Sequence, residues 1–176
     1  MFVHRRFRSW ASLIVKSAEA VKWSVVPGFD GKTVVTATAK VEAAMRTLLN
    51  KVEEHSEFED GQLFRFYREH CPDIRDDVRD LEADHSERQL EDKALVALQA
   101  LRLEVIEGYQ QLPAGRLARA EQLAADAVAA VKAYVVALEK HMEREERLLL
   151  ARWLNLTPAL YRVYREYLFG KHRLVY

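Results

Sequence analysis

Two histidine–glutamate pairs stand four residues apart in long segments that have the periodicity of amphipathic helices. His55 and Glu59 continue the apolar stripe of one segment, and His141 and Glu145 continue that of another. Residues four apart lie one above the other on the same face of a helix, so each pair is expected to face the core. Burying an imidazole and a carboxylate is unfavourable unless a partner satisfies them. A metal ion would do so, and the pairs therefore predict a metal site.

Two more histidines, His4 and His85, are expected at the same level of a helical bundle. In an antiparallel bundle, two residues are level when they lie equally far from the turn that joins their helices, because every residue adds the same rise. His4 and His55 are nearly equidistant from the turn between them, as are His55 and His85, and His85 and His141. One layer would thus receive four histidines and two glutamates.

The elements that must position these residues are four long helices. Apolar residues recur at helical spacing over residues 3–25, 33–70, 73–108 and 117–153, and segments rich in Pro and Gly separate them. Thr157 and Pro158 predict the cap and first turn of a shorter fifth helix. No segment has a convincing strand pattern. We therefore predict an all-α protein, with an antiparallel up-down four-helix bundle at residues 1–152 and a C-terminal helix and tail at 153–176 that pack on it.

The composition argues against several classes of partner. The formal net charge of the 176 residues is zero, which does not favour a nucleic-acid or membrane-surface binder. No apolar run approaches the roughly 20 residues that span a bilayer. The one cysteine, Cys71, fits a reducing compartment, so we predict a cytoplasmic protein. The Arg-rich start, residues 1–23, also has the character of a mitochondrial transit peptide, which is the alternative for this segment.

Four imidazoles and two carboxylates suit two first-row metal ions. Nitrogen donors favour Fe, Zn, Cu or Ni, and carboxylates can bridge two cations. A structural zinc site is normally closed by four ligands and rarely uses six. Six ligands shared by two metals leave open positions, which is what binding of O₂, peroxide or NO requires.

On these residues the chain resembles the hemerythrin-like, or HHE cation-binding, family. The resemblance covers roughly residues 1–150. It rests on His55-x-x-x-Glu59-Asp60 followed by Leu63-Phe64, on a histidine in the first and third helices, and on His141-x-x-x-Glu145. It implies a four-helix bundle with a non-haem di-iron centre. The implied terminal ligands are His4, His55, His85 and His141, and the implied bridging carboxylates are Glu59 and Glu145.

Two departures separate the chain from the oxygen-carrying members. Those proteins have two histidines four apart on the third helix, but Leu81 and Gln89 stand four residues from His85. They also place an aspartate five residues after the histidine of the fourth helix, where this chain has Glu146, with Glu145 at four. We prefer Glu145 because it continues the apolar stripe. The pattern is more similar to iron- and oxygen-sensing domains, so we expect a protein that binds or senses O₂, peroxide, NO or iron, with redox activity on O₂ or peroxide left open.

Three alternatives accompany this interpretation. A ferritin-like site needs two Glu-x-x-His motifs, and only Glu82-x-x-His85 is present. Singly, a core histidine is more often a hydrogen-bonded structural residue than a ligand, and either glutamate could be solvated. The protein would then be a helical interaction module with an empty or degenerate metal layer. The aromatic and basic residues 161–176 suit either a partner surface or packing on the bundle itself.

Overall fold

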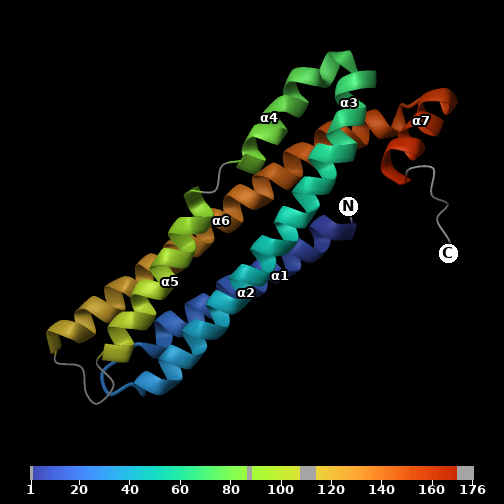
Figure 1. Cartoon of the computed structure of the whole chain (residues 1–176). Coiled ribbons are helices and arrows are strands. Elements are labelled where there is room, and N and C mark those ends of the chain that lie inside the picture. The colour runs from blue at the N-terminus through green and yellow to red at the C-terminus, as the bar shows by residue number, and fades with distance from the viewer. Residues whose placement is uncertain (1, 87–88, 108–113, 170–176) are drawn as a thin grey trace. The chain divides into compact units, whose positions relative to one another are not determined.

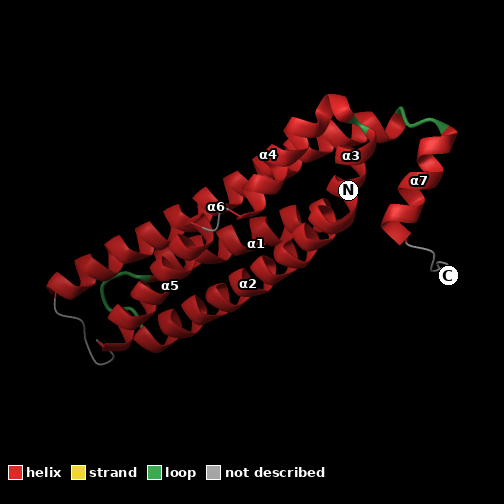
Figure 2. Ribbon diagram, turned by 45° about the horizontal axis from the view of Figure 1, so that its top comes forward, coloured by secondary structure: helices red, strands yellow, loops and turns green. Residues whose placement is uncertain are grey.

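The computed structural model describes residues 2–86, 89–107 and 114–169, and nearly all of these are helical (Figure 1). The elements in chain order are α1 (Phe2–Ser24), α2 (Gly31–Phe58), the π-helix η1 (Glu59–Leu63), α3 (Phe64–His70), the 3₁₀-helix η2 (Pro72–Ile74), α4 (Arg75–Ser86), α5 (Gln89–Glu107), α6 (Ala114–Leu154) and α7 (Pro158–Phe169). No strand occurs within the described residues (Figure 2). The prediction of an all-α helical bundle with an additional C-terminal helix is confirmed.

The chain forms two compact units, each assembled from segments far apart in the sequence. The first comprises Met1–Asn50 and Arg88–Glu139, and the second comprises Lys51–Glu87 and Lys140–Tyr176. Of the predicted helix over 73–108, the structure describes α4 in the second unit and α5 in the first, and residues 87–88 and 108 lie outside the described residues. None of the helices in the described part of the chain is both long and apolar enough to span a bilayer.

The first unit contains α1, α5 and the first parts of α2 and α6, which lie side by side in both views (Figures 1 and 2). Each of these segments buries one apolar stripe, as the periodicity predicted. The buried side chains include Phe7, Ala11, Ile14 and Val21 of α1, Met45 and Leu48 of α2, Leu98 and Leu101 of α5, and Ala124 and Val131 of α6.

A buried carboxylate also joins α2 to α5 in this unit. Arg46 donates from Nη2 to Glu42 Oε1 at 2.9 Å, and the side-chain amide of Gln99 donates to the same oxygen at 3.3 Å. Arg102 Nε lies 3.5 Å from Glu42 Oε2. Burial by itself would raise the pKa of Glu42, but these hydrogen bonds and the two guanidinium charges outweigh it and hold the pKa below its usual value.

The second unit has its own apolar core, which is built mainly on α3 and α4. Its buried members are Phe64, Phe66, Tyr67, Cys71, Ile74, Val78, Leu81 and Leu149. Tyr67 contributes its ring to this core and satisfies its hydroxyl by donating to the carbonyl oxygen of Leu149 on α6, at 3.1 Å.

The π-helix η1 changes which residues face this core. Phe64 donates its backbone N–H to the carbonyl of Glu59, five residues earlier, so one residue is effectively inserted into the helix. An uninterrupted α-helix would place Leu63, four residues after Glu59, on the buried face. Instead Phe64 is fully buried, whereas Leu63 is only partly buried. The buried position is therefore one residue later than in a regular α-helix, because the register shifts inside η1.

Helix α7 packs on η1 and α3 within the second unit. Its Tyr164 and Tyr167 rings meet the edge of Phe66, with centroids 5.1 and 5.7 Å away. Tyr167 also donates its hydroxyl to Glu69. At the start of the helix, Thr157 accepts from the backbone N–H of Leu160 at 3.3 Å, so the predicted cap is confirmed.

Candidate metal centre

Three carboxylate and imidazole side chains meet where α2 ends, η1 begins and α6 passes. His55, Glu59 and Glu145 each offer a ligand atom within 4.8 Å of the others. His55 Nε2 lies 2.9 Å from Glu59 Oε1. Glu59 and Glu145 are buried, with 2% and 5% of their surface exposed, so these charges lie in a region from which water is largely excluded. Such charges require a compensating partner.

A second group shares Glu59 and adds one histidine each from α4 and α6. His85 Nε2 lies 3.0 Å from His141 Nε2 and 3.7 Å from Glu59 Oε2. Again the three ligand atoms lie within 4.8 Å of one another. The two oxygens of Glu59 therefore face different groups, Oε1 toward His55 and Oε2 toward His85.

These separations fit coordination of metal ions. Two donor atoms that bind one ion at right angles, each about 2.1 Å from it, are about 3.0 Å apart. The His85–His141 separation of 3.0 Å and the His55–Glu59 separation of 2.9 Å match that geometry. Imidazole and carboxylate donors together suit Fe, Zn, Cu and Ni better than Mg or Ca. The residues present thus fit a pair of first-row metal sites that share one carboxylate.

Two outer carboxylates hold the histidine rings of the second group. Asp60 Oδ1 lies 2.8 Å from His85 Nδ1, and Asp84 Oδ2 lies 3.1 Å from His141 Nδ1. A proton held on each Nδ1 by its carboxylate leaves Nε2 as the lone-pair donor. Arg144 in turn donates to Asp84 Oδ2 at 3.0 Å. The outer residues therefore fix both the orientation and the tautomer that metal binding needs.

The protonation state of His141 also favours ligation. Burial lowers the pKa of His141, and the neighbouring His85 lowers it further. The hydrogen bond to Asp84 and the negative charges of Asp84 and Glu59 act in the opposite direction, but the net shift is downward. A neutral imidazole is the form that binds a metal ion.

An aromatic contact holds the plane of the His85 ring. The ring of Phe64 stacks on His85, with centroids 5.4 Å apart and an angle of 14° between the rings. Phe64 reaches this position because the π-helix places it, rather than Leu63, on the buried face. Short π-helical insertions occur frequently at functional sites. The insertion thus places both Glu59 and Phe64 on the buried side of the helix, and Phe64 is the ring that stacks on His85.

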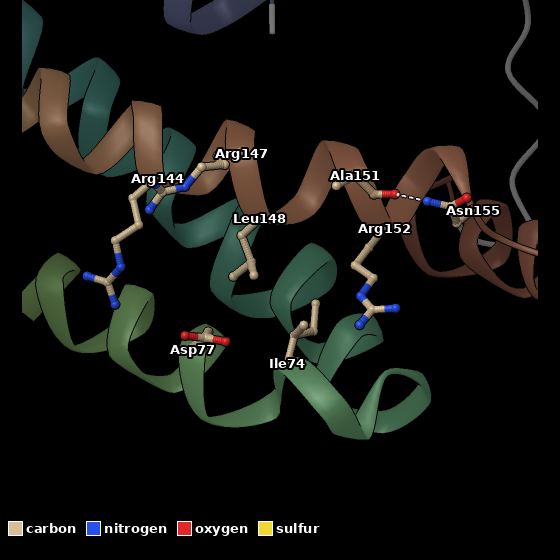
Figure 3. Close-up of a pocket in the computed structure, with 8 residues that line it drawn as sticks. All are labelled: Ile74, Asp77, Arg144, Arg147, Leu148, Ala151, Arg152 and Asn155. Atoms are coloured by element: carbon tan, nitrogen blue, oxygen red, sulfur yellow. Dashed lines mark hydrogen bonds between the residues drawn. The ribbon is translucent and has the colours of Figure 1, made fainter.

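A cavity of about 400 Å³ lies between α6 and the segment formed by η2 and α4 (Figure 3). Ile74 and Leu148 contribute apolar surface, and Arg144, Arg147 and Asp77 contribute charge. The Arg144 side chain extends from α6 toward α4 in Figure 3, and the same residue binds Asp84. A solute in this cavity would consequently lie next to the residue that holds the His141 ring through Asp84.

The second unit brings together five of the six predicted ligands: His55, Glu59, His85, His141 and Glu145. Its clusters contain Glu145 and not the half-buried Glu146. His4 is buried on α1 in the first unit, and its role as a ligand stays a prediction.

Sequence reasoning missed the outer residues and the π-helix. Asp60 follows Glu59 directly and Asp84 precedes His85, so adjacency to a predicted ligand was an available signal. That signal is weak, because many other acidic residues occupy the same two segments. The π-helix had only one local hint, Gly61, a poor residue for a helix interior.

A helical bundle that gathers partly buried histidines around buried glutamates in this way defines the class of helical cation-binding proteins. The family model of the hemerythrin HHE cation binding domain matches residues 3–153. The chain belongs to this family, and the resemblance drawn from the sequence is confirmed. No significant match was found among curated proteins or among solved structures. Helix α7 lies beyond the residues that the family model matches.

Proposed function

We propose that this protein binds a non-haem di-iron centre in its second unit and uses it to bind or sense O₂, peroxide or NO. One observation carries the proposal. Glu59 offers one oxygen to His55 at 2.9 Å and turns the other toward His85 at 3.7 Å, and it belongs to both groups of potential ligands. A carboxylate in that position is suited to bridge two cations.

In this proposal each metal takes its own set of terminal ligands. His55 belongs to one site, to which His4 would add a second imidazole. His85 and His141 belong to the other site and are held by their outer carboxylates. Glu145 would be the second bridging carboxylate, as membership of the family implies, because it is buried and reaches the His55 side of Glu59.

When bound, a ferrous pair would supply two electrons and open coordination positions for a diatomic molecule or peroxide. The chain's own contribution is to hold the ligand side chains in position. Phe64 stacks on His85, and Asp60 and Asp84 orient the imidazoles. Three to four protein donors for each metal leave room for one small ligand, which favours binding, sensing or reduction of that ligand over a purely structural role.

The decisive experiment is metal analysis of the full chain after anaerobic reconstitution with ferrous iron, followed by exposure to air. We expect about two irons per chain, as in other di-iron helical bundles, and new near-ultraviolet absorption after oxidation. A folded helical protein that takes up no iron would refute the proposal and would support the alternative of a helical interaction module.

Variants then test the ligands one at a time. His55→Ala and His141→Ala should each lose iron, whereas Glu57→Ala, an exposed neighbour of the cluster, should keep it. Unchanged iron in both histidine variants would refute the assignment. His4→Ala decides separately whether α1 supplies a ligand, because retention of both irons in that variant would exclude it.

A further inference from the structure

A continuous row of tyrosine and tryptophan rings runs through the second unit from α3 to the surface near the end of α6. Tyr67 contacts Tyr164 with ring centroids 6.4 Å apart, Tyr164 stacks on Tyr161 at 6.1 Å, and Tyr161 meets Trp153 at 6.4 Å. These distances lie within the range of direct aromatic contact. All four side chains can undergo one-electron oxidation. Each ring contacts the next directly, with no Phe or Leu side chain between them.

The inner end of the row lies beside the candidate metal centre. Tyr67 is 1% exposed, and its hydroxyl donates to the carbonyl of Leu149, one helical turn beyond Glu145 on α6. Leu149 and Glu145 are four residues apart and share one face of α6, so the Tyr67 hydroxyl is bound to the helical turn that follows a candidate ligand.

The outer end of the row is open to solvent. Trp153 is 39% exposed and Tyr161 is 40% exposed. Because both outer residues are exposed, the indole N–H and the phenol O–H can release a proton directly to water when they are oxidised.

We propose that Tyr67, Tyr164, Tyr161 and Trp153 form an electron relay that carries oxidising equivalents from the metal centre to the surface when the centre meets excess peroxide. This inference rests on the proposed function. One peroxide takes up two electrons and two protons and becomes two molecules of water. Trp153 and Tyr161 supply these two electrons, one each, which pass along the row toward the metal centre. Each residue also releases one proton to water, Trp153 from its indole N–H and Tyr161 from its phenol O–H. Two molecules of a thiol then restore them by giving one electron and one proton each, and become a disulfide.

The first arm of the test uses the metal-free full chain, so it does not depend on the proposed function. Trp10→Phe and Trp23→Phe leave Trp153 as the only one of the three tryptophans. Azide radicals generated by pulse radiolysis oxidise this indole. We expect its radical absorbance to decay as phenoxyl absorbance rises, at a rate independent of protein concentration. Tyr161→Phe should abolish this transfer; an unchanged rate in that variant would overturn the relay.

The matched control is Tyr167→Phe. Tyr167 belongs to the same aromatic cluster and contacts Phe66 and His70, but it lies off the row. This variant should keep the transfer at the rate of its parent. Loss of transfer in Tyr167→Phe as well as in Tyr161→Phe would mean that the packing of α7, and not the row, is responsible, and would also overturn the proposal.

The second arm uses iron-loaded protein mixed with excess hydrogen peroxide, with freeze-quench EPR and peptide mapping of oxidised residues. We expect radicals and oxidation products at Trp153 and Tyr161, and their loss in Tyr164→Phe with bound iron unchanged. The same oxidation pattern in Tyr164→Phe, or in metal-free protein, would show a diffusible oxidant and refute the relay. Absence of bound iron would refute the proposed function, and the first arm would still decide whether electrons pass along the row. Bound iron without peroxide consumption would refute the relay and leave the proposed function standing.

Discussion

Replacing Asp60 tests whether the outer carboxylates prepare the histidines for metal. Asp60→Ala removes the acceptor that lies 2.8 Å from His85 Nδ1 and leaves the ring free to rotate or to change tautomer. Loss of such an outer partner typically weakens metal binding about 10- to 100-fold, which corresponds to about 1.4–2.7 kcal/mol. Because the Asp60 side chain is 42% exposed, water can take over part of its role. We therefore expect a loss near the lower limit, about tenfold.

A second substitution at the same position separates charge from hydrogen bonding. Asp60→Asn keeps a side-chain oxygen that can accept from His85 Nδ1, so it should lose less affinity than Asp60→Ala. The assay is a competition titration against a chelator at fixed pH, followed by absorbance. Glu57→Ala is the control, because Glu57 is exposed and belongs to neither group of potential ligands.

The outcome that would contradict this reasoning is an affinity for both Asp60 variants equal to that of the wild-type protein. The His85 ring would then be held by its stacking on Phe64 alone. Thermal melting of the metal-free variants provides an internal check. A large loss of stability without metal would mean that Asp60 maintains the fold of η1 and not the tautomer of His85.

Three further predictions concern stability. Leu81→Ala empties a fully buried position of the second unit and should cost about 2–5 kcal/mol of unfolding free energy in urea, whereas Leu103→Ala, 56% exposed, should cost far less; equal costs would contradict the described core. Thr157→Ala should destabilise α7 by about 1 kcal/mol, measured by hydrogen exchange of its amides, and Thr157→Ser should restore protection. Because the folded pKa of Glu42 is depressed, its contribution to stability is present above its unfolded pKa of about 4.5 and is lost as the pH falls through the folded value. Glu42→Gln should therefore be less stable at neutral pH, with the difference shrinking in acid; a difference that does not depend on pH would refute this account.

The periodicity of the sequence predicted the helices of the first unit well, because each contributes one uninterrupted apolar stripe to a core. The stripe that runs from Phe7 to Val21 is buried as expected. The periodicity did not predict the π-helix of the second unit, since a π-helix depends on which of two registers packs better and not on local propensity. Both registers place an apolar residue, Leu63 or Phe64, on the inner face. Only packing against α4 and α6 separates them.

The sequence was enough to predict the family, the all-α class and the potential ligands, because residues at helical spacing lie on the same face of a helix. His55 with Glu59, and His141 with Glu145, needed only the four-residue period. The tertiary structure alone decided how the donors divide into two groups, with Glu59 common to both. It also decided that Asp60 and Asp84, among many acidic neighbours, hold the imidazoles, because that choice depends on the distance between side chains of different helices. The sequence by itself specifies which residues share a face, and only packing specifies which faces meet.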